Sequence, residues 1–180
     1  MRIVHGAVAL LIGMMACTTA AQAFSAIGLR NSLQNCLDRD ISPPDRIEAC
    51  NQVIHTNILL QHDQARVIAS RGNAYFVSGN LDKAFDDYNK AFELNARLPP
   101  AIVNRGLAYT RLGKCDQAIS DFNTALSLDA HLWQALYGRN LCEAKAGDKA
   151  KAQADLAAAT AIEPNAAQQF APMEITRWYQ

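Results

Sequence analysis

Cysteine is the residue of this sequence whose chemistry can be named most directly. Cys36, Cys50, Cys115 and Cys142 lie along the body of the chain, and a fifth, Cys17, lies in an apolar stretch near the N-terminus. Four cysteines in an exported chain predict two disulfides, and they allow three different pairings. The spacing along the sequence does not choose among the three.

The same cysteines and the nearby histidines allow two other kinds of chemistry, thiol catalysis and metal binding. A catalytic cysteine needs a base beside it and a lowered pKa, and no cysteine here has a histidine placed by helical spacing to serve it. His55 and His62 lie seven residues apart near a predicted loop. Combining them with Cys36 and Cys50 gives a spacing that fits no usual zinc module, and an oxidising compartment favours disulfides over thiolate ligands. We therefore expect no metal and no other cofactor.

Other catalytic signatures are missing from the sequence. It contains no phosphate-binding glycine loop and none of the motifs GxSxG, HExxH and CxxC. Its charged residues instead recur at a fixed spacing of 34 residues. The recurring residues are the acids Asp87, Asp121 and Asp155 and the bases Arg71, Arg105 and Arg139. We interpret them as structural arginine–aspartate pairs between helices, partly exposed and individually weak, and we expect no enzymatic activity.

The first 23 residues are typical of a secretory signal peptide. Arg2 gives a positive start, residues 3–15 are almost wholly apolar, and residues 21–23 read Ala-Gln-Ala, which fits a small-x-small cleavage site. The apolar run is too short to span a membrane comfortably. We favour cleavage directly after this triplet. The alternative is a lipoprotein signal in which Cys17 is lipidated, although Met14 stands where such signals usually have leucine.

Length and composition favour a single helical domain. The chain has 180 residues, 50% of them hydrophobic but only 7% aromatic, and alanine and leucine supply much of the apolar content. Its formal net charge is zero, so no basic excess points to nucleic acid or to an anionic membrane surface.

An internal repeat of 34 residues organises most of the chain. Stretches that begin at Ala65, Pro99 and Trp133 align without gaps, and such a period indicates a solenoid or a repeat array. In the third stretch Asn140 and Glu143 replace the glycine and the tyrosine of the first two, so its first helix is expected to pack differently. The residues that coincide in all three stretches are the glycines Gly79, Gly113 and Gly147, the alanines Ala84, Ala118 and Ala152 and again Ala91, Ala125 and Ala159, and the large residues Tyr88, Phe122 and Leu156.

The pattern resembles the tetratricopeptide repeat (TPR), a helix-turn-helix unit of this length with small residues and aromatics at set places. The resemblance covers residues 65–166 and implies an all-α, right-handed solenoid of helical hairpins with three clear repeats. It also implies a degenerate N-terminal repeat, in which RIEACNQVI matches AISDFNTAL, and a short C-terminal cap, because terminal repeats need one. The expected divisions are a signal peptide at 1–23, the degenerate repeat and a linker at 24–64, repeats at 65–98, 99–132 and 133–166, and the cap and tail at 167–180.

By the same resemblance, the first helix of each repeat lines a concave groove in which family members usually bind peptides or protein segments. The residues expected to point into it include no acid and three bases. They imply a protein or peptide partner with apolar anchors and some negative charge, its backbone held by asparagine amides. The alternative is that the inward-facing helices carry small and apolar residues only to allow curvature. The candidate partner-binding residues are Arg66, Asn73, Phe76, Val103, Asn104, Leu107, Arg111, Tyr137, Leu141 and Lys145.

Some family members clamp a C-terminal carboxylate between two asparagines and several bases. Asn73 and Asn104 match the asparagines of that pattern. Ala69, Gln134 and Gly138 stand where the bases would be expected. The resemblance therefore does not imply the full clamp, nor the binding of chaperone tails that goes with it.

The repeat register also implies a pairing of the cysteines. Cys115 lies at the start of the second helix of its repeat, on an edge that faces the first helix of the next repeat, where Cys142 lies. Cys36 and Cys50 lie on the two helices of the degenerate repeat. The register therefore favours one link between the second and third repeats and one within the degenerate repeat. Loop entropy predicts that each stabilises the fold by roughly 3–4 kcal/mol.

Together these features predict a non-enzymatic protein–protein interaction module in the bacterial cell envelope. We expect export to the periplasm, because this resemblance and a signal peptide occur together there. The alternatives are a structural scaffold subunit and, if Cys17 is lipidated, a membrane-anchored lipoprotein that acts as an assembly factor of an envelope complex. A small hydrolase has the weakest support, because the sequence outside the repeats is too short for a catalytic domain.

Overall fold

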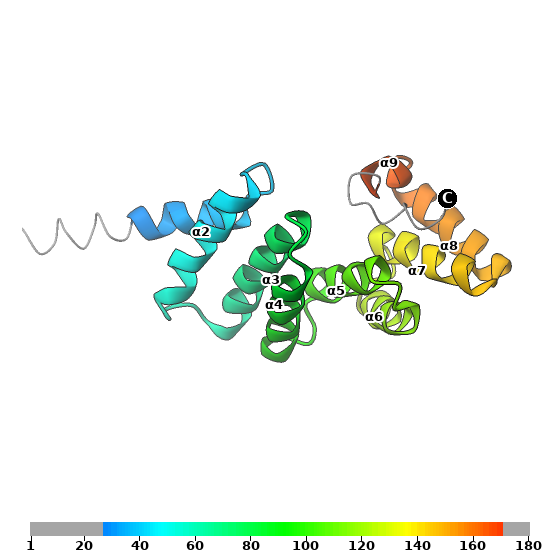
Figure 1. The fold of residues 1–180 in the computed structure, drawn as a ribbon, viewed down its shortest axis with the longest axis horizontal. Helices are drawn as coiled ribbons and strands as arrows, with labels where there is room; N and C mark the ends of the chain where they lie inside the picture. The colour runs from blue at the N-terminus through cyan, green and yellow to red at the C-terminus, as the bar shows by residue number, and fades with distance from the viewer. Residues whose placement is uncertain (1–26, 171–180) are drawn as a thin grey trace, which may run out of the picture.

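The computed structural model describes residues 27–170, so the expected signal peptide, Cys17 and residues 171–180 of the expected tail lie outside the described part. Within it every regular element is an α-helix, which confirms the all-α prediction, and successive helices run back and forth as a row of stacked hairpins (Figure 1). None of the described helices is both long enough and apolar enough to cross a membrane. They are a helix over residues 27–37, α2 (Pro43–His55), α3 (Gln61–Val77), α4 (Leu81–Leu94), α5 (Pro99–Arg111), α6 (Cys115–Leu128), α7 (Trp133–Ala146), α8 (Lys149–Ile162) and α9 (Ala166–Phe170).

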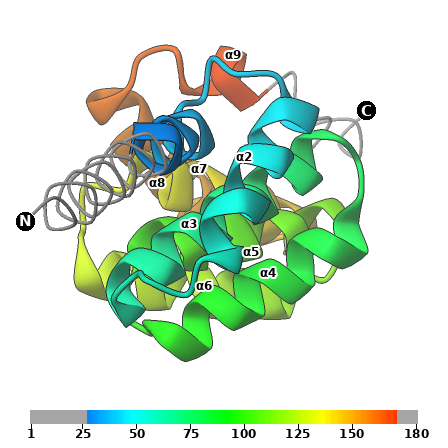
Figure 2. The same ribbon diagram turned by 90° about the vertical axis from the view of Figure 1, so that its left-hand side faces the viewer.

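Each helix packs mainly on its neighbours in the sequence, as a solenoid requires. The hairpins are α3 with α4, α5 with α6 and α7 with α8. Their first helices also contact one another in turn, α3 with α5 and α5 with α7. In both views the segment between residues 37 and 43 and the short helix α9 lie on the same side of the row (Figures 1 and 2).

A glycine makes each hairpin turn possible. Gly79, Gly113 and Gly147 have φ values of 79°, 72° and 87°, in the left-handed region where a side chain would be strained. The next helix then begins within two residues. In the first and third hairpins the side chains of Asn80 and Asp148 cap that helix by accepting a hydrogen bond from a backbone N–H. The repeated glycine of the sequence therefore ends the first helix of each repeat, as its left-handed tendency predicts.

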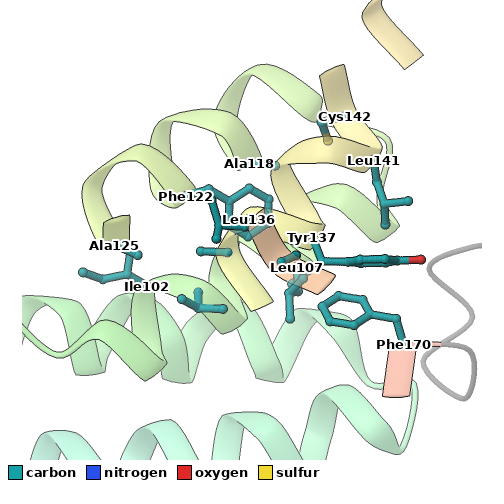
Figure 3. Packing of buried hydrophobic residues seen from close by; sticks show 14 of the residues in the cluster. Ile102, Leu107, Ala118, Phe122, Ala125, Leu136, Tyr137, Leu141, Cys142 and Phe170 are labelled. Atoms are coloured by element: carbon teal, nitrogen blue, oxygen red, sulfur yellow. The ribbon is translucent and has the colours of Figure 1, made fainter. Parts of the chain in front are cut away.

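A large side chain from the second helix fills the space that glycines leave on the first helices. Phe122 of α6 is fully buried, and Figure 3 shows its ring among the side chains of α5, α6 and α7. A Cβ atom added at Gly106 would lie 2.7 Å from this ring, and Gly138 of the next repeat touches the ring as well. Tyr88 holds the equivalent place one repeat earlier, against Gly72. Repeats are thus joined by a ring that packs on two successive first helices.

The third repeat departs from this scheme. Leu156, which the alignment places in the same large slot, is 39% exposed, so the expectation that it fills the slot is wrong. The physical reason is that no first helix of a further repeat packs on α8 within the described residues. Asn140 and Glu143, the two residues that break the repeat pattern, are buried in this repeat.

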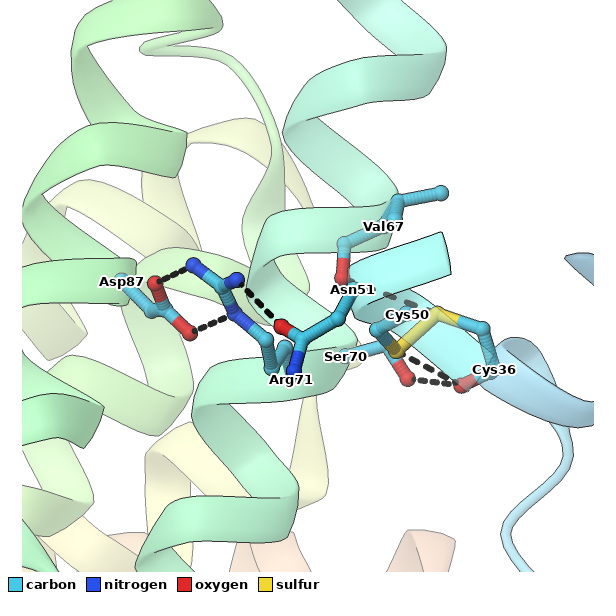
Figure 4. The surroundings of a disulfide bond; sticks show 7 residues. All are labelled: Cys36, Cys50, Asn51, Val67, Ser70, Arg71 and Asp87. Atoms are coloured by element: carbon cyan, nitrogen blue, oxygen red, sulfur yellow. Dashed lines mark hydrogen bonds and ion pairs between the residues drawn. A yellow bond between two sulfur atoms is a disulfide. The ribbon is translucent and has the colours of Figure 1, made fainter. Parts of the chain in front are cut away.

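The helix over residues 27–37 and α2 form an N-terminal hairpin, in the segment where the sequence predicts a degenerate repeat. The helix over residues 27–37 packs on α2, and α2 packs on α3 as the second helix of a repeat would. Ser42 caps α2, and two prolines follow it in the first turn, where their missing N–H groups are not needed. Cys36 and Cys50 are joined across the hairpin as a disulfide, with their Cα atoms 4.7 Å apart (Figure 4).

One arginine in each repeat ties its hairpin to the one before. Arg71 donates from Nε and Nη2 to the carboxylate of Asp87 at 2.8 and 2.7 Å, and its Nη1 donates to Asn51 on α2 at 2.7 Å (Figure 4). We call these three-residue contacts the arginine ladder. The predicted arginine–aspartate pairs are therefore present, but their aspartate side chains are only 8–10% exposed, which is more buried than expected. The later rungs are Arg105 with Asp121 and Asn89, and Arg139 with Asp155 and Asn123.

Candidate partner-binding groove

Two adjoining pockets lie along α3 and α5, on the side of the row that carries α9. Each has a volume of about 160 Å³. Because four residues border both pockets, we treat them as one feature, the α3–α5 groove. The shared residues are Arg39, Asn73, Pro100 and Asn104. The apolar part of the lining includes Phe76, Val103, Leu107, Leu98 and Trp133.

Six of the ten predicted partner-binding residues line this groove. They come from the first helices of the first two repeats, and the spacing of those helices sets them side by side. These residues are Arg66, Asn73, Phe76, Val103, Asn104 and Leu107.

The structure places the other four predicted residues outside the groove. Tyr137 and Leu141 border neither pocket and belong to the core between repeats. Arg111 donates to the carbonyl oxygen of Phe76 at 3.2 Å and lies over its ring. Lys145 is exposed near the turn at Gly113. Their role in partner binding stays a prediction that the groove itself does not support.

The short helix α9 explains why the third repeat contributes so little to the groove. Phe170 is fully buried, with its ring centroid 4.7 Å from that of Tyr137 and 5.7 Å from that of Trp133. Figure 3 shows Phe170 lying beside Tyr137 and Leu107. Gln169, one residue earlier, borders the groove. The helix α9 therefore packs on α7 and borders one end of the groove.

Sequence reasoning missed Arg39, which borders both pockets. This residue lies in the connection between the helix over residues 27–37 and α2, outside the 34-residue repeat. Periodicity could not assign it to the inner face, because residues 27–60 do not follow the 34-residue spacing of the later stretches. Gln169 and Trp133 were missed for a related reason, since their place depends on how α9 folds back.

The groove is lined by no acidic residue, and two of its polar side chains, Asn73 and Asn104, are available to bind a ligand. The side-chain amides of Asn73 and Asn104 make no hydrogen bond with any described residue, although both are only partly exposed. An amide offers both a donor and an acceptor, which is what a peptide backbone requires. The groove therefore combines apolar walls with two amides that lack partners in the described chain.

The inner wall of the groove contains a buried hydroxyl without a partner. Tyr88 is fully buried, borders the first pocket, and its hydroxyl makes no hydrogen bond. Burial raises the pKa of Tyr88 far above its usual value, and the charge of nearby Arg46 opposes this only in part. Arg46 is itself buried with Nε unpaired, and burial followed by the charge of Arg39 lowers the pKa of its guanidinium. The hydroxyl thus stays protonated and can donate.

The other residues considered for chemistry do not converge. Within residues 27–170, no three or more His, Cys, Asp or Glu side chains are grouped to hold a metal ion. His55 and His62 are exposed, and the Nδ1 atom of His62 lies 2.8 Å from the amide of Asn95. Cys115 and Cys142 are joined between α6 and α7 with Cα atoms 5.2 Å apart, the second pairing that the register favours.

A third pocket, of about 360 Å³, lies among α6, α7 and α8 outside the groove. Glu143 borders it and is 8% exposed, and one of its carboxylate oxygens, Oε2, is buried without a partner. The pocket occupies the place where Phe85 and Tyr109 stack one repeat earlier, at 4.8 Å between ring centroids. Ile119 and Glu143 replace that aromatic pair and leave the space unfilled.

Comparison with known proteins identifies the repeat. One family profile, described as "TPR repeat", matches residues 72–113, and a second, described as "Tetratricopeptide repeat", matches residues 99–131. No protein of curated function matches the sequence. The two profiles together span the groove-forming helix α5 and its neighbours.

Solved structures show the same fold. The chain superposes on the first TPR domain of Spaghetti (RPAP3), bound to the HSP90 peptide SRMEEVD, with a TM-score of 0.57 and 28% identity, covering 68% of this chain and 98% of that one. It superposes on MamA with a TM-score of 0.57 and 24% identity over 70% of this chain and 71% of that chain. For the Arabidopsis OM64 TPR domain the TM-score is 0.58 and the identity 23%, covering 67% of this chain and all of that one. The chain therefore contains tetratricopeptide repeats within residues 72–131 and has the helical-hairpin solenoid fold of the TPR structures on which it superposes.

Proposed function

We propose that this protein is a non-enzymatic interaction module that holds a peptide or protein segment in the α3–α5 groove. The observation that carries the proposal is the pairing of apolar walls with the amides of Asn73 and Asn104, which have no partner in the described chain. An extended segment can place apolar side chains in the two pockets while its backbone bonds to the amides.

Solved relatives support this use of the fold. The first and the second TPR domains of Spaghetti (RPAP3) are each solved with the HSP90 peptide SRMEEVD, and the second TPR domain of human RPAP3 is solved with an HSP70 peptide. A further relative, YrrB, is described as having an unusual peptide-binding site. We extend peptide binding to this chain because its groove lies on the first helices of its repeats.

The cap limits where the ligand lies. Phe170 and Gln169 of α9 cover the inner side of α7, so the accessible groove runs across α3 and α5. The partner segment therefore contacts the first two repeats and the N-terminal hairpin. It carries apolar anchors for the side chains of Phe76 and Leu107 and some negative charge, since no acid lines the groove.

We place this function in the bacterial cell envelope, in the periplasm. The two cysteine pairs support an oxidising compartment, because disulfides persist there and are rare in the cytosol. The leader that would direct export lies outside the described residues, as does Cys17, whose lipidation would instead give a membrane-anchored form.

A structural scaffold subunit is the second candidate. Ile58 and Leu60, two positions apart in the connection between α2 and α3, are 65% and 77% exposed, and exposed apolar side chains favour a protein contact. A scaffold would use this connection and leave the groove empty. A Leu60→Ser variant that loses a co-purified partner while keeping peptide binding would favour the scaffold.

Selection from a random dodecapeptide display library tests the groove. We expect the mature chain to enrich peptides that bind it in solution, and we expect Asn73→Ala and Asn104→Ala to weaken that binding. Each lost hydrogen bond corresponds to roughly a five- to tenfold change. Gln117→Ala, an exposed change on α6, is the matched control. Selected peptides whose affinity is the same for all four proteins would refute the proposed site.

A further inference from the structure

A pocket between the last two hairpins lies outside the α3–α5 groove. It has a volume of about 360 Å³ and is lined by α6, α7 and α8, and we call it the α6–α8 pocket. A cavity of about 150 Å³ is enough to admit a benzene ring, so this pocket has room for an aromatic side chain. Ile119 and Ala154 form the apolar part of its lining. Asn123 and Lys151 on its border are exposed, so a ligand can enter from the solvent.

In the preceding repeat, aromatic rings fill the corresponding place. The ring of Phe85 packs on that of Tyr109, with the two ring centroids 4.8 Å apart. In the 34-residue register, Ile119 replaces this phenylalanine and Glu143 replaces this tyrosine. The α6–α8 pocket is therefore the place of an aromatic pair that the third repeat does not supply.

The first repeat shows which charge accompanies a ring at this place. The Nζ atom of Lys83 lies 5.3 Å from the ring centroid of Tyr75. Two repeats later, the same register gives Glu143 in place of that tyrosine and Lys151 in place of that lysine. Because Lys151 borders the α6–α8 pocket, a ring held there lies near an ammonium group, which attracts the face of an aromatic ring.

Glu143 brings to the pocket a buried carboxylate that has no hydrogen-bond partner among the described residues. The residue is 8% exposed, and its Oε2 atom is buried without a hydrogen bond. Its Oε1 atom lies 4.0 Å from Nε of Arg139, which is beyond hydrogen-bond distance. Burial raises the pKa of this carboxyl group, because the surroundings compensate its charge poorly. A ligand that donates a hydrogen bond to it satisfies a buried acceptor.

The other charged groups around the pocket are already paired. Arg139 donates to Asp155 at 2.6 and 2.7 Å and to Asn123 at 2.6 Å, as the last rung of the arginine ladder. The Nζ atom of Lys151 lies 2.7 Å from the carboxylate of Asp148. Two cations thus border the pocket and disfavour a third, so a neutral donor suits the unpaired carboxylate better than a cationic one.

We propose that the α6–α8 pocket binds the phenol ring of a tyrosine side chain of a partner protein, and that the phenol hydroxyl donates a hydrogen bond to the carboxylate of Glu143. A phenol combines the two properties that the pocket lacks, an aromatic ring and a neutral donor. The ring lies against Ile119 and Ala154, with the ammonium group of Lys151 near its face. This second contact surface is separate from the α3–α5 groove and does not depend on peptide binding there.

Nuclear magnetic resonance of the mature protein tests the pocket with N-acetyltyrosinamide, a tyrosine with both ends blocked. N-acetylphenylalaninamide, which lacks only the hydroxyl, is the matched comparison. The readout is the backbone amide signals of Asn123 and Ala154, which line the pocket. We expect both compounds to shift these signals saturably, and the tyrosine compound to bind about tenfold more tightly, as a hydrogen bond to a charged group predicts.

Three variants assign this preference to the pocket. Glu143→Leu removes the acceptor and should lower the affinity for N-acetyltyrosinamide to that for N-acetylphenylalaninamide. Glu143→Tyr restores the residue of the first two repeats, so its ring should fill the pocket and abolish the binding of both compounds. Glu93→Leu, the same change at an exposed position on α4, is the matched control and should keep the tenfold preference.

Equal affinities for the two compounds would overturn the inference, as would an unchanged preference in Glu143→Leu or its loss in Glu93→Leu. Tighter binding of benzylamine than of N-acetyltyrosinamide would assign the pocket to a cation instead. Binding of p-cresol without binding of N-acetyltyrosinamide would assign it to a free phenol and reject the tyrosine side chain. Backbone amide spectra check that each variant is folded. If Glu143→Leu does not fold, the comparison of the two compounds and the Glu143→Tyr variant decide.

Discussion

Asp121 accepts two parallel hydrogen bonds from Arg105, one from Nε at 2.8 Å and one from Nη2 at 2.7 Å. The aspartate side chain is only 9% exposed, so this ion pair is held largely away from water. The same guanidinium reaches Asn89 of the preceding repeat at 3.1 Å. Breaking one half of such a pair leaves the other charge without compensation, which costs more than the loss of an exposed pair.

We expect Asp121→Asn to lower the free energy of unfolding by about 2–3 kcal/mol, because an amide cannot accept both hydrogen bonds. Urea unfolding followed by circular dichroism measures the change. Glu93→Gln is the matched control, since it breaks the exposed Lys90–Glu93 pair at 3.1 Å and should cost less than about 0.5 kcal/mol. Equal effects in the two variants would contradict the structural role of the arginine ladder.

Glu143 gives the protein a pH dependence of known sign. Burial, with smaller contributions from the charges of Asp155 and Asp148, raises the pKa of this carboxyl group, while Arg139 and Lys151 oppose the rise. A carboxyl group with a raised pKa binds its proton more tightly in the folded state than in the unfolded chain. Its contribution to stability is therefore greatest at low pH and is lost as the pH rises through the raised value.

The comparison protein is Glu143→Gln, which keeps the shape and removes the titration. Relative to this variant, we expect the wild type to lose stability between pH 4.5, the ordinary value for the group, and neutral pH. Urea unfolding of both proteins at the two pH values measures the difference. A difference that does not change with pH would show that the carboxyl group is not perturbed.

The link between Cys115 and Cys142 is predicted to staple the second repeat to the third. The two residues are separated by 27 positions, and closing a loop of that size should stabilise the fold by roughly 3–4 kcal/mol. Replacing both cysteines by serine should therefore lower the free energy of unfolding by about this amount. Peptide mapping without reductant should recover Cys115 linked to Cys142 and Cys36 linked to Cys50. Four free thiols would refute the pairing.

The docking of α9 depends on one aromatic ring. Because Phe170 is fully buried against Tyr137 and Trp133, we expect Phe170→Ala to lower the free energy of unfolding by about 3–5 kcal/mol and to expose Trp133 to water. A shift of the Trp133 emission to longer wavelength, recorded in a Trp178→Phe background, is the direct measurement. Gln168→Ala, an exposed change on the same helix, should leave the emission where it is.

The hairpins and their order follow from periodicity, because glycine and alanine at fixed places dictate where helices end and approach. The pairing of the recurring arginines and aspartates could also be predicted from the sequence. Each arginine and its aspartate, such as Arg105 and Asp121, are 16 residues apart and lie on the two helices of one hairpin. The burial of the aspartate side chains could not be predicted, because it depends on how the neighbouring repeat packs. The sequence shows that Glu143 replaces the tyrosine of the first two repeats. It does not show the pocket that this replacement leaves.

The sequence predicted the residues of the groove only where the repeat is regular. Asn73 and Asn104 could be placed because they sit on helices whose register is fixed by glycine turns. Tyr137 and Leu141 were assigned to the groove by the same register, yet they border neither pocket, and the ring of Phe170 packs on that of Tyr137. Arg39 could not be found, since a connection of irregular conformation carries it. In this protein the accessible part of the inner face depends on the N-terminal hairpin and on α9. Neither segment follows the 34-residue period.

The arginine ladder has a consequence for how the molecule unfolds. Each rung couples one hairpin to the one before it, alongside the buried ring of Phe122 and the Cys115–Cys142 link, so we expect cooperativity in this array to be a nearest-neighbour property of its three joints. Weakening the middle joint at Arg105 should divide the molecule into two segments that melt separately, whereas weakening the last joint at Arg139 should only fray one end. Whether a destabilising substitution disrupts the groove then depends on its position along the row of hairpins as well as on how much it lowers the free energy of unfolding.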